Sequence, residues 1–318
     1  NGNHAIPQGE LFVTEGDEYD TAFFDKRPKF LHYSPFASIL TGVEFDHADI
    51  YQDLEHIKDS FRKFVNIIHP EGFLLATVSD THTKDVLAGA SCKVETYGFS
   101  PSADWVANDY RFEDGKGYFA LSHQGEKIAT FHLPMIGRHN IENATAVAAM
   151  SLKLGLTTQE VQKGFQTFKG IKRRQEVVGV KNRVTVIDDF AHHPTAIQLT
   201  LEAVQEAYPG RRIWAIFEPR SATCKRKVFE DRLPKSFTPA NRVIIADLFA
   251  PDKIDPKDRL DPELVVEQIK SDGGNAYFIP DIEALVEKLA IECRPKDVLL
   301  IMSSGGFSGI HQKLITRL

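Results

Sequence analysis

The sequence of 318 residues has little cysteine, no long apolar run and no excess of basic residues. Its cysteines, Cys92, Cys224 and Cys293, lie far apart and form no CxxC pair, which argues against a disulfide framework and a zinc knuckle. The longest apolar runs, such as Val298 to Met302, are far shorter than the roughly 20 residues that cross a bilayer. With 38 Lys and Arg against 44 Asp and Glu, the net charge of -6 gives no basic field for a nucleic acid or an anionic membrane. We expect a cytoplasmic protein.

Two motifs of well-known enzyme classes are also missing. The sequence has no GxxxxGK[ST] phosphate loop and no GxSxG motif of an acyl-serine enzyme. The composition, 42% hydrophobic and 26% charged, is that of an ordinary globular protein rather than a disordered or fibrous one. At roughly 150 residues per domain, the length suggests about two domains. Any phosphate must therefore be bound locally, by a site other than this loop.

The first part of the chain alternates between strand-like and helix-like patterns. Leu11 to Glu15 predicts a short buried strand that ends in an acidic residue, and Ala37 to Leu40 predicts a second strand. Apolar residues at helical spacing predict a helix over 53–68, followed by a strand over Phe73 to Val78. Between Val94 and His132, strands broken by Gly-containing turns predict a small antiparallel sheet.

The second part repeats the alternation after a basic connector. Helices are expected at about 140–154 and 158–168, and the connector Lys169 to Arg174 is the predicted domain boundary, giving domains 1–172 and 173–318. Alternating strands and helices predict an α/β fold, with a parallel Rossmann-like sheet that is covered on both faces. Ligands of such sheets bind beyond the carboxyl ends of the strands. The expected strands are 184–187, 212–217, 243–248, 276–279 and 298–302, and the expected helices are 194–208, 262–270, 282–293 and 310–318.

Acidic residues gather after the first two predicted strands. They form the runs Glu15 to Asp20 and Glu44 to Asp49, and the second run includes His47. Carboxylates with one imidazole suit Mg²⁺ or Mn²⁺ held beside nucleotide phosphates. The alternative is a solvated acidic loop with a surface histidine.

A second cluster, Gly137 to Asn143, begins an alanine-rich helix. Asn140 has both a donor and an acceptor for the edge of a heterocycle such as adenine, although ordinary N-capping by Asn140 explains it equally well. A third cluster joins Lys172-Arg173-Arg174 to Asp188-Asp189 and His192-His193-Pro194. Arginine stabilises the charge of a transferring phosphoryl group, whereas the alternatives are a solvated linker and a metal site at the paired histidines.

Two further clusters directly follow predicted strands of the second domain. They are Glu218-Pro219-Arg220-Ser221 and the Ser/Gly run Ser303 to Gly309. Backbone N–H groups of a Ser/Gly run can receive a carboxylate, with Arg220 as its charge partner. A glycine-rich helix entry that serves packing is the alternative.

In order and spacing, these clusters resemble the Mur ligase family, whose members join UDP-muramic acid derivatives to amino acids or peptides. Within the family, the chain is similar to the members that join UDP-N-acetylmuramate to the murein tripeptide L-alanyl-γ-D-glutamyl-meso-diaminopimelate in peptidoglycan recycling. The segments that carry the family resemblance are Phe12 to Asp20, Glu44 to Asp49, Gly137 to Asn140, Lys172 to Arg174 and Asp188 to Thr195. Those that carry the closer likeness are Thr21 to Arg27, Phe217 to Ser221 and Met302 to Lys313.

The resemblance implies ATP-dependent amide formation through an acyl phosphate. It implies that Glu15 and His47 hold Mg²⁺, that Asn140 and His139 contact the nucleotide, and that Arg174 contacts phosphate. It further implies that Asp189 approaches the ribose or the metal and that His192 lines the cleft. Arg220, Ser303 and Ser304 would face the peptide. We expect a monomer or a weak homo-oligomer.

The chain departs from the family pattern at its start. Family members have an N-terminal domain that binds the UDP-sugar and a TGKT-type phosphate loop, and the sequence from Asn1 contains neither. We therefore expect this stretch to be an inactive fragment, the rest of the central ATPase domain followed by the C-terminal domain. Some members also carry a carbamoylated lysine near the helix after His47, where Lys58 and Lys63 lie.

Three other functions stay open at this stage. A sibling ligase would add alanine to UDP-N-acetylmuramate or glutamate to folate. A non-catalytic module would bind peptide or nucleotide without turnover. A metallohydrolase would use His47, Asp49, His192 and His193 as metal ligands.

Overall fold

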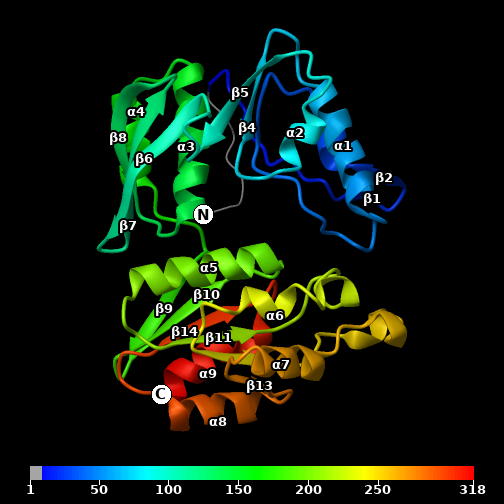
Figure 1. Cartoon of the computed structure of the whole chain (residues 1–318), viewed down its shortest axis with the longest axis vertical. Helices are drawn as coiled ribbons and strands as arrows, with labels where there is room; N and C mark the ends of the chain where they lie inside the picture. Colours follow the sequence, from blue (N-terminus) through cyan, green and yellow to red (C-terminus); the bar gives the residue numbers. More distant parts are fainter. Residues whose placement is uncertain (1–8) are drawn as a thin grey trace.

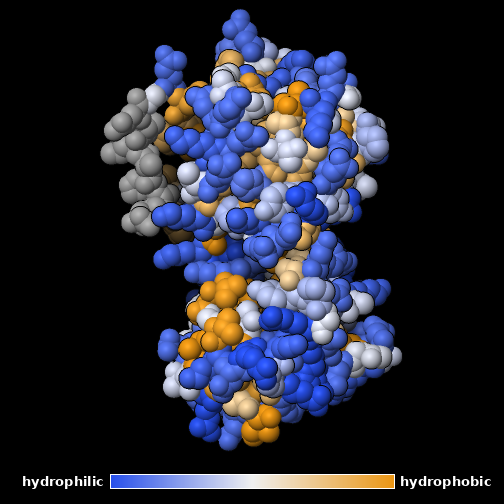
Figure 2. Space-filling view, turned by 90° about the vertical axis from the view of Figure 1, so that its left-hand side faces the viewer, coloured by the Kyte–Doolittle hydropathy of each residue, from blue (hydrophilic) through white to orange (hydrophobic). Residues whose placement is uncertain are grey.

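The computed structural model describes residues 9–318. The chain forms two lobes, each built around one six-stranded sheet (Figure 1), and Figure 2 shows a narrower waist between them. The lobes are connected between helix α4 (Thr158–Thr167) and strand β9 (Glu176–Lys181), and the boundary predicted between residues 172 and 173 falls in this connection. The predicted α/β fold class is confirmed. No helix within 9–318 is long and apolar enough to cross a membrane.

The first sheet has the strand order β3-β4-β5-β6-β7-β8. The strands from β3 to β6 pair in parallel, and β7 pairs antiparallel with both β6 and β8. The predicted small antiparallel sheet is confirmed as strands β6 to β8, and parallel pairing of β5 with β6 at Tyr97 and Gly98 joins it to the parallel part. Both hairpins turn at two residues with positive φ, Asp114-Gly115 and Gln124-Gly125. The strands are β3 (Ala37–Leu40), β4 (Phe73–Thr77), β5 (Lys93–Gly98), β6 (Trp105–Glu113), β7 (Lys116–His123) and β8 (Glu126–Leu133).

Helices cover both faces of this sheet. Helix α1 (Leu54–Asn66) begins at Asp53, whose carboxylate accepts the N–H of His56, and it buries Ile57 and Val65 on one face. Helix α3 (Arg138–Lys153) lies on the other face, where small side chains allow close packing. The buried alanines of α3 are Ala144, Ala146, Ala148 and Ala149. The remaining helices of this lobe are α2 (Thr83–Val86) and α4.

The second sheet has the order β13-β12-β11-β14-β10-β9, parallel except for the edge strand β9. Alternate residues of its strands face opposite cores, as Leu299 and Leu300 of β14 do. The sequence did not predict β9, which carries the exposed Val177 and Val180 and pairs only with β10. The other strands are β10 (Val184–Asp189), β11 (Ile213–Phe217), β12 (Arg242–Ile245), β13 (Ala276–Phe278) and β14 (Val298–Met302). The helices are α5 (Pro194–Ala207), α6 (Leu233–Ser236), α7 (Pro262–Ser271), α8 (Ile282–Glu292) and α9 (Ile310–Arg317).

The strand predicted for Leu11 to Glu15 is wrong. This segment has no regular structure, and Val13 is 90% exposed. An apolar run becomes a strand only where a neighbour supplies backbone hydrogen bonds, and β3, at the edge of the sheet, pairs with β4 alone among the described strands. The first regular element is instead the hairpin of β1 (Asp20–Ala22) and β2 (Asp25–Pro28).

Candidate active site at the junction of the lobes

Four loops leave the second sheet at one edge, because β12, β11, β14 and β10 are parallel and end on the same side. In this spatial order the loops begin at Ala246, Glu218, Ser303 and Phe190. Ligands of parallel sheets bind beyond such strand ends. This edge, called the acceptor edge below, therefore collects the clusters predicted for the second domain.

The first lobe meets the second beside β10. After β3, the loop that contains Glu44 and Phe45 lies against the start of α5. The hydroxyl of Thr195 donates to the Glu44 carboxylate at 2.7 Å, and Nε2 of His193 lies 3.2 Å from the carbonyl oxygen of Phe45. The predicted acidic run 44–49 is thus part of the junction between the lobes.

His47 lies in this loop and contacts an acidic residue of the run 15–20. Its Nε2 lies 2.9 Å from Oε1 of Glu18, whose backbone carbonyl accepts the hydroxyl of Tyr51 at 2.6 Å. Burial lowers the pKa of His47, but Glu18 and the nearby Asp46 outweigh burial and raise it overall. Glu15 is exposed, because nothing orders its segment as a strand. The contact of His47 in this structure is thus Glu18 of the same acidic run, and no group of three or more metal-binding side chains is found within 9–318.

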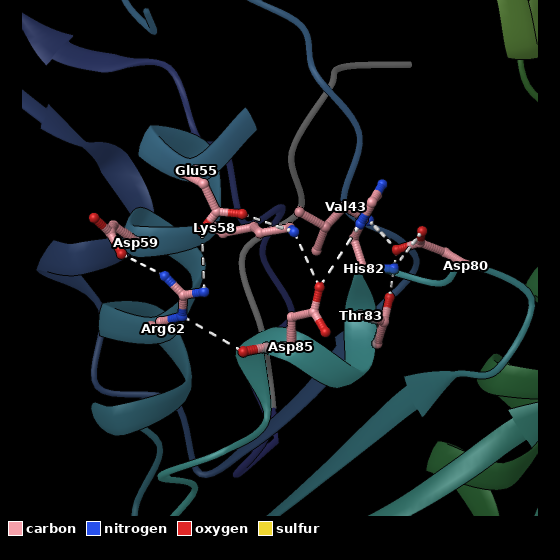
Figure 3. Close-up of polar contacts among 9 residues, drawn as sticks. All are labelled: Val43, Glu55, Lys58, Asp59, Arg62, Asp80, His82, Thr83 and Asp85. Atoms are coloured by element: carbon pink, nitrogen blue, oxygen red, sulfur yellow. Dashed lines mark hydrogen bonds and ion pairs between the residues drawn. The ribbon is translucent and has the colours of Figure 1, made fainter. Parts of the chain in front are cut away.

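An ion-pair network behind this loop involves Lys58 (Figure 3). Nζ of Lys58 lies 2.9 Å from Oε1 of Glu55 and 3.0 Å from Oδ2 of Asp85, and these carboxylates raise its pKa. Lys58 therefore ties α1 to α2 through two ion pairs. Beside it, the Asp80 carboxylate accepts the N–H of Val43 at 2.8 Å and fixes the loop after β3.

At the start of α3, Asn140 is buried and donates from Nδ2 to the carbonyl of Ile136 at 2.7 Å. The N-cap of the helix is Gly137, so the alternative of N-capping by Asn140 is also wrong. This bond uses one of the two N–H donors of the Asn140 amide and leaves the other N–H and the oxygen. The neighbouring His139 has a pKa lowered to about 4 by burial and then by the charge of Arg174, and its Nδ1 is buried without a partner in the described chain.

The connector between the lobes places two arginine side chains against the aromatic ring of Phe190. The guanidinium carbons of Arg173 and Arg174 lie 5.1 and 5.4 Å from the ring centre of Phe190. Arg173 also donates from Nη2 to the carbonyl oxygens of Ser303 at 2.5 Å and Gly305 at 2.7 Å. Arg173 therefore holds the Ser/Gly loop, while Arg174 lies close to His139 at the junction of the lobes.

Asp189 fixes the connector to the end of β10. Its Oδ2 accepts the N–H of Gln175 at 2.8 Å, and its Oδ1 accepts the N–H of Ala191 at 2.7 Å. Burial is the largest effect on this carboxyl group and raises its pKa despite both bonds. Its two oxygens thus already position Arg174 and the loop after β10.

The two histidines after β10 face different partners. Nδ1 of His193 accepts the N–H of Thr195, so its Nε2 carries the proton that it donates to Phe45, and burial lowers its pKa. Nδ1 of His192 lies 3.0 Å from the carbonyl oxygen of Phe190, and its Nε2 lies 3.9 Å from Oδ2 of Asp46. The alternative of a metal site at these rings is not supported by this geometry.

Ser303 is buried and its hydroxyl is fully used inside the protein. It donates to Oε2 of Glu218 at 2.5 Å and accepts the N–H of Gly305 at 2.9 Å. The role of Ser303 visible here is therefore to join the loops after β14 and β11. Ser304 is half-buried in the same loop.

Arg220 is the cation at the centre of the acceptor edge. Its guanidinium carbon lies 3.4 Å from the ring centre of Phe249, and its Nη1 lies 3.5 Å from Oε2 of Glu218. On the other side is Gly305, where an added Cβ would fall 1.9 Å from Nε of Arg220. The absence of a side chain at Gly305 thus allows Arg220 to lie flat on Phe249.

A cavity of about 850 Å³ runs along β3 to the junction of the lobes. Glu18, Glu44, Asp46 and His193 are among its lining residues, but the predicted nucleotide contacts Asn140, Arg174 and Asp189 are not. Glu15 and His47 do not line it either, so the residues to which the family resemblance gives a role lie outside this cavity.

Sequence reasoning missed several residues that shape the site. Arg173 and Glu218 lie in motifs that it identified, and Glu218 directly follows β11, which is the signal that could have found it. Phe249 lies four residues after β12 with no motif around it, and only the fold brings it to Arg220.

Comparison with known proteins gives the same outline. The profile of the Mur ligase middle domain matches residues 5–151, and that of the Mur ligase glutamate ligase domain matches residues 173–305. The chain is 36% identical to the UDP-N-acetylmuramate–L-alanyl-γ-D-glutamyl-meso-2,6-diaminoheptandioate ligase of Haemophilus influenzae, over 96% of its own length and 65% of that relative's. It is 34% identical to the UDP-N-acetylmuramate–L-alanine ligase of Acetivibrio thermocellus, covering 96% of this chain and 63% of the relative.

A solved structure also matches across both lobes. The murein peptide ligase of Psychrobacter arcticus is 32% identical with a TM-score of 0.67, covering 95% of this chain and 61% of that one. The chain thus spans somewhat less than two thirds of the length of these relatives. On these matches to both domain profiles and to whole relatives, the chain belongs to the Mur ligase family.

Proposed function

We propose that this chain forms the ATPase and acceptor-binding parts of a ligase that joins UDP-N-acetylmuramate to L-alanyl-γ-D-glutamyl-meso-diaminopimelate. In this reaction the muramoyl carboxylate takes the γ-phosphoryl group of ATP, the amine of the peptide attacks the acyl phosphate, and phosphate leaves. Both ATP and UDP-sugars are cytoplasmic metabolites, which would place the reaction there. The related ligase of Haemophilus influenzae bears this pair of substrates in its name.

The observation that carries the proposal is a continuous series of contacts along the acceptor edge. The carboxylate of Asp189 holds the connector that bears Arg174, and the backbone carbonyl of Asp189 accepts the N–H of Ser303. The hydroxyl of Ser303 in turn donates to Glu218, which lies beside Arg220. A cation at the junction of the lobes and a second one further along the edge suit phosphate at one end and a carboxylate-bearing acceptor at the other.

Charge neutralisation is the main demand of phosphoryl transfer. Arg174 would supply it at the junction, where His139 and His192 also lie, and the oxygen of Asn140 remains open to a heterocycle. Mg²⁺ would neutralise phosphate charge when bound, and carboxylates of the segment 15–18 are its candidate ligands together with His47. Of these, Glu18 lies next to His47 in this structure, so Glu15 would have to move to take part.

The second candidate is a ligase that adds L-alanine, because relatives with that name are about equally similar. We favour the peptide because Arg220, whose guanidinium is fixed between Phe249 and Gly305, offers a cation for a carboxylate of the acceptor. We further propose that these 318 residues alone do not ligate, since they contain no GxxxxGK[ST] loop.

The test is ADP release by the complete gene product with UDP-N-acetylmuramate and either the tripeptide or L-alanine. The proposal expects turnover with the tripeptide and little with L-alanine. Turnover with L-alanine alone would reject it. A parallel calorimetric titration of the 318-residue chain with MgATP tests the last point, because micromolar affinity would contradict the role assigned to the missing loop.

A further inference from the structure

The last two residues of β10 are aspartates that face opposite sides of the second sheet. Val184 and Val186 of this strand pack into the core that includes α9, and the alternation of side chains places Asp188 on the same side. Asp189 faces the other side, where its carboxylate holds the connector. Asp188 is 9% exposed, and a buried carboxylate is costly unless other groups compensate its charge.

Two basic residues contact the Asp188 carboxylate. Nε of Arg173 lies 3.4 Å from its Oδ2, and Nε2 of His311 lies 3.1 Å from its Oδ1. Oδ1 of Asp188 and Nε2 of His311 are both buried, and neither atom has another partner among the described residues. Because an unpaired buried polar atom is destabilising, these two atoms depend on each other.

The same two basic residues hold the Ser/Gly loop, residues 303–309, at both ends. Arg173 donates to the carbonyl oxygens of Ser303 and Gly305 at the start of the loop. His311 lies in the first turn of α9, which begins directly after the loop. Asp188 therefore connects the start of the loop to the helix that follows it.

The loop needs this support because its backbone is strained. Phe307 and Ser308 have φ angles of 42° and 49°, in the left-handed region that residues with a side chain rarely adopt. Such residues persist only where surrounding contacts fix them. The position of Gly305 in this loop also matters for Arg220, since an added Cβ would fall 1.9 Å from Nε of Arg220. A displaced loop would therefore displace the cation at the centre of the acceptor edge.

We propose that Asp188 and His311 are positioning residues of the ligase, which fix the Ser/Gly loop and thereby keep Arg220 in place for the acceptor. This inference rests on the proposed function. Both residues act through the loop rather than by contact with the acceptor, since their facing atoms are buried. Loss of either side chain weakens acceptor binding, whereas Asp189 still holds the connector beside Arg174, so ATP binding changes little.

The test measures kcat and KM of the complete gene product with the tripeptide and with ATP. In Asp188→Asn the amide has one oxygen and no charge, so it cannot accept from both Arg173 and His311. Its KM for the tripeptide should rise by about tenfold or more, while kcat and the KM for ATP change little. The matched control is Asp297→Asn, because Asp297 is 3% exposed and paired with Arg212 at 2.5 Å, but precedes β14 at the opposite end of the sheet. It should lower the unfolding temperature and leave both KM values unchanged.

Two substitutions of His311 separate positioning from a merely structural role. In His311→Gln the side-chain amide nitrogen can take the place of Nε2 and donate to Asp188, whereas His311→Ala leaves the carboxylate without this partner. The KM for the tripeptide should stay near the unaltered value in His311→Gln and rise in His311→Ala. A structural role would lower the unfolding temperature of His311→Ala with no change in KM. If Asp188→Asn does not fold, this pair of variants decides the question.

Hydrogen exchange of the same proteins follows the loop directly. Peptides that cover 303–309 should exchange about tenfold or more faster in Asp188→Asn than in Asp297→Asn. Equal exchange, or equal KM values for the tripeptide, in these two variants overturns the inference alone when the unaltered enzyme turns over the tripeptide. An unaltered enzyme that does not turn over the tripeptide rejects the proposed function and the inference with it.

Discussion

Thr195 of the second lobe donates its hydroxyl to the carboxylate of Glu44 in the first lobe at 2.7 Å. Arg232 reaches the same carboxylate oxygen at 3.3 Å. The pair joins the loop after β3 to the first turn of α5, which are the elements that carry the predicted acidic run and the paired histidines. One carboxylate thus connects the cavity along β3 to the acceptor edge.

Replacing Glu44 with Ala should loosen the junction without unfolding either lobe. The side chain is 39% exposed, so its contacts with Thr195 and Arg232 are worth about 0.5–1 kcal/mol. Small-angle scattering should show a larger radius of gyration, and hydrogen exchange should accelerate at the N–H of Ala48, which donates to Thr223 across the junction. Glu202→Ala, a change at an exposed position of α5, is the control. Identical scattering for both variants would mean that other contacts hold the lobes.

Gly305→Ala should displace Arg220. The new Cβ would lie 1.9 Å from Nε of Arg220, so the guanidinium must leave the ring of Phe249. We expect a loss of about 1–3 kcal/mol in stability and an increase of about tenfold or more in the acceptor KM of the complete gene product. Gly306→Ala is the matched control, because nothing lies within 4 Å of a Cβ there. Equal KM values for both variants would remove Arg220 from acceptor binding.

Much of the fold could be predicted from periodicity. Helix α1 and strand β14 were predicted nearly to their ends. In α1 the apolar residues recur at helical spacing, and β14 is a short run of apolar, buried residues. The strand over Leu11 to Glu15 failed because hydrophobicity does not show whether a neighbouring strand is present. Strand β9 was missed for the converse reason, since its pairing with β10 orders a segment whose valines stay exposed.

The site could be located from the sequence, but the side-chain roles could not. Motifs after strands singled out Asp189, Ser303 and Arg220, and the structure places these residues along one edge of the second sheet. Which atoms remain free depends on contacts between loops that are distant in sequence, such as the bond from Ser303 to Glu218, 85 residues apart. The contact between His47 and Glu18, 29 residues apart, likewise depends on how two loops meet and has no signal in the sequence.

Lys58 should resist amine-modifying reagents. It is 7% exposed and held by Glu55 and Asp85, which raise its pKa and keep the amine protonated. Lys63, exposed on the same helix, provides the internal comparison. After mild acetylation of the folded chain, peptide mass spectrometry should find Lys63 modified and Lys58 intact. Rapid acetylation or a carbamate at Lys58 would contradict the ion-pair network of Figure 3.

The stability of the first lobe should fall with acid because of Glu95. This carboxylate is 4% exposed, and although burial raises its pKa, hydrogen bonds from Lys153, Lys93 and Trp105 outweigh burial and lower the pKa from 4.5 to about 2. The folded-state pKa lies below the unfolded one, so the contribution, about 3 kcal/mol, is fully present above about pH 4.5 and is lost as the pH falls towards 2. Denaturant unfolding should show that Glu95→Gln is less stable than the unaltered chain at neutral pH and loses less stability on acidification. The control is Glu126→Gln, at an exposed position on β8, whose free energy of unfolding should fall with acid as in the unaltered chain. If the free energy of unfolding of Glu95→Gln falls just as much, another carboxylate is responsible.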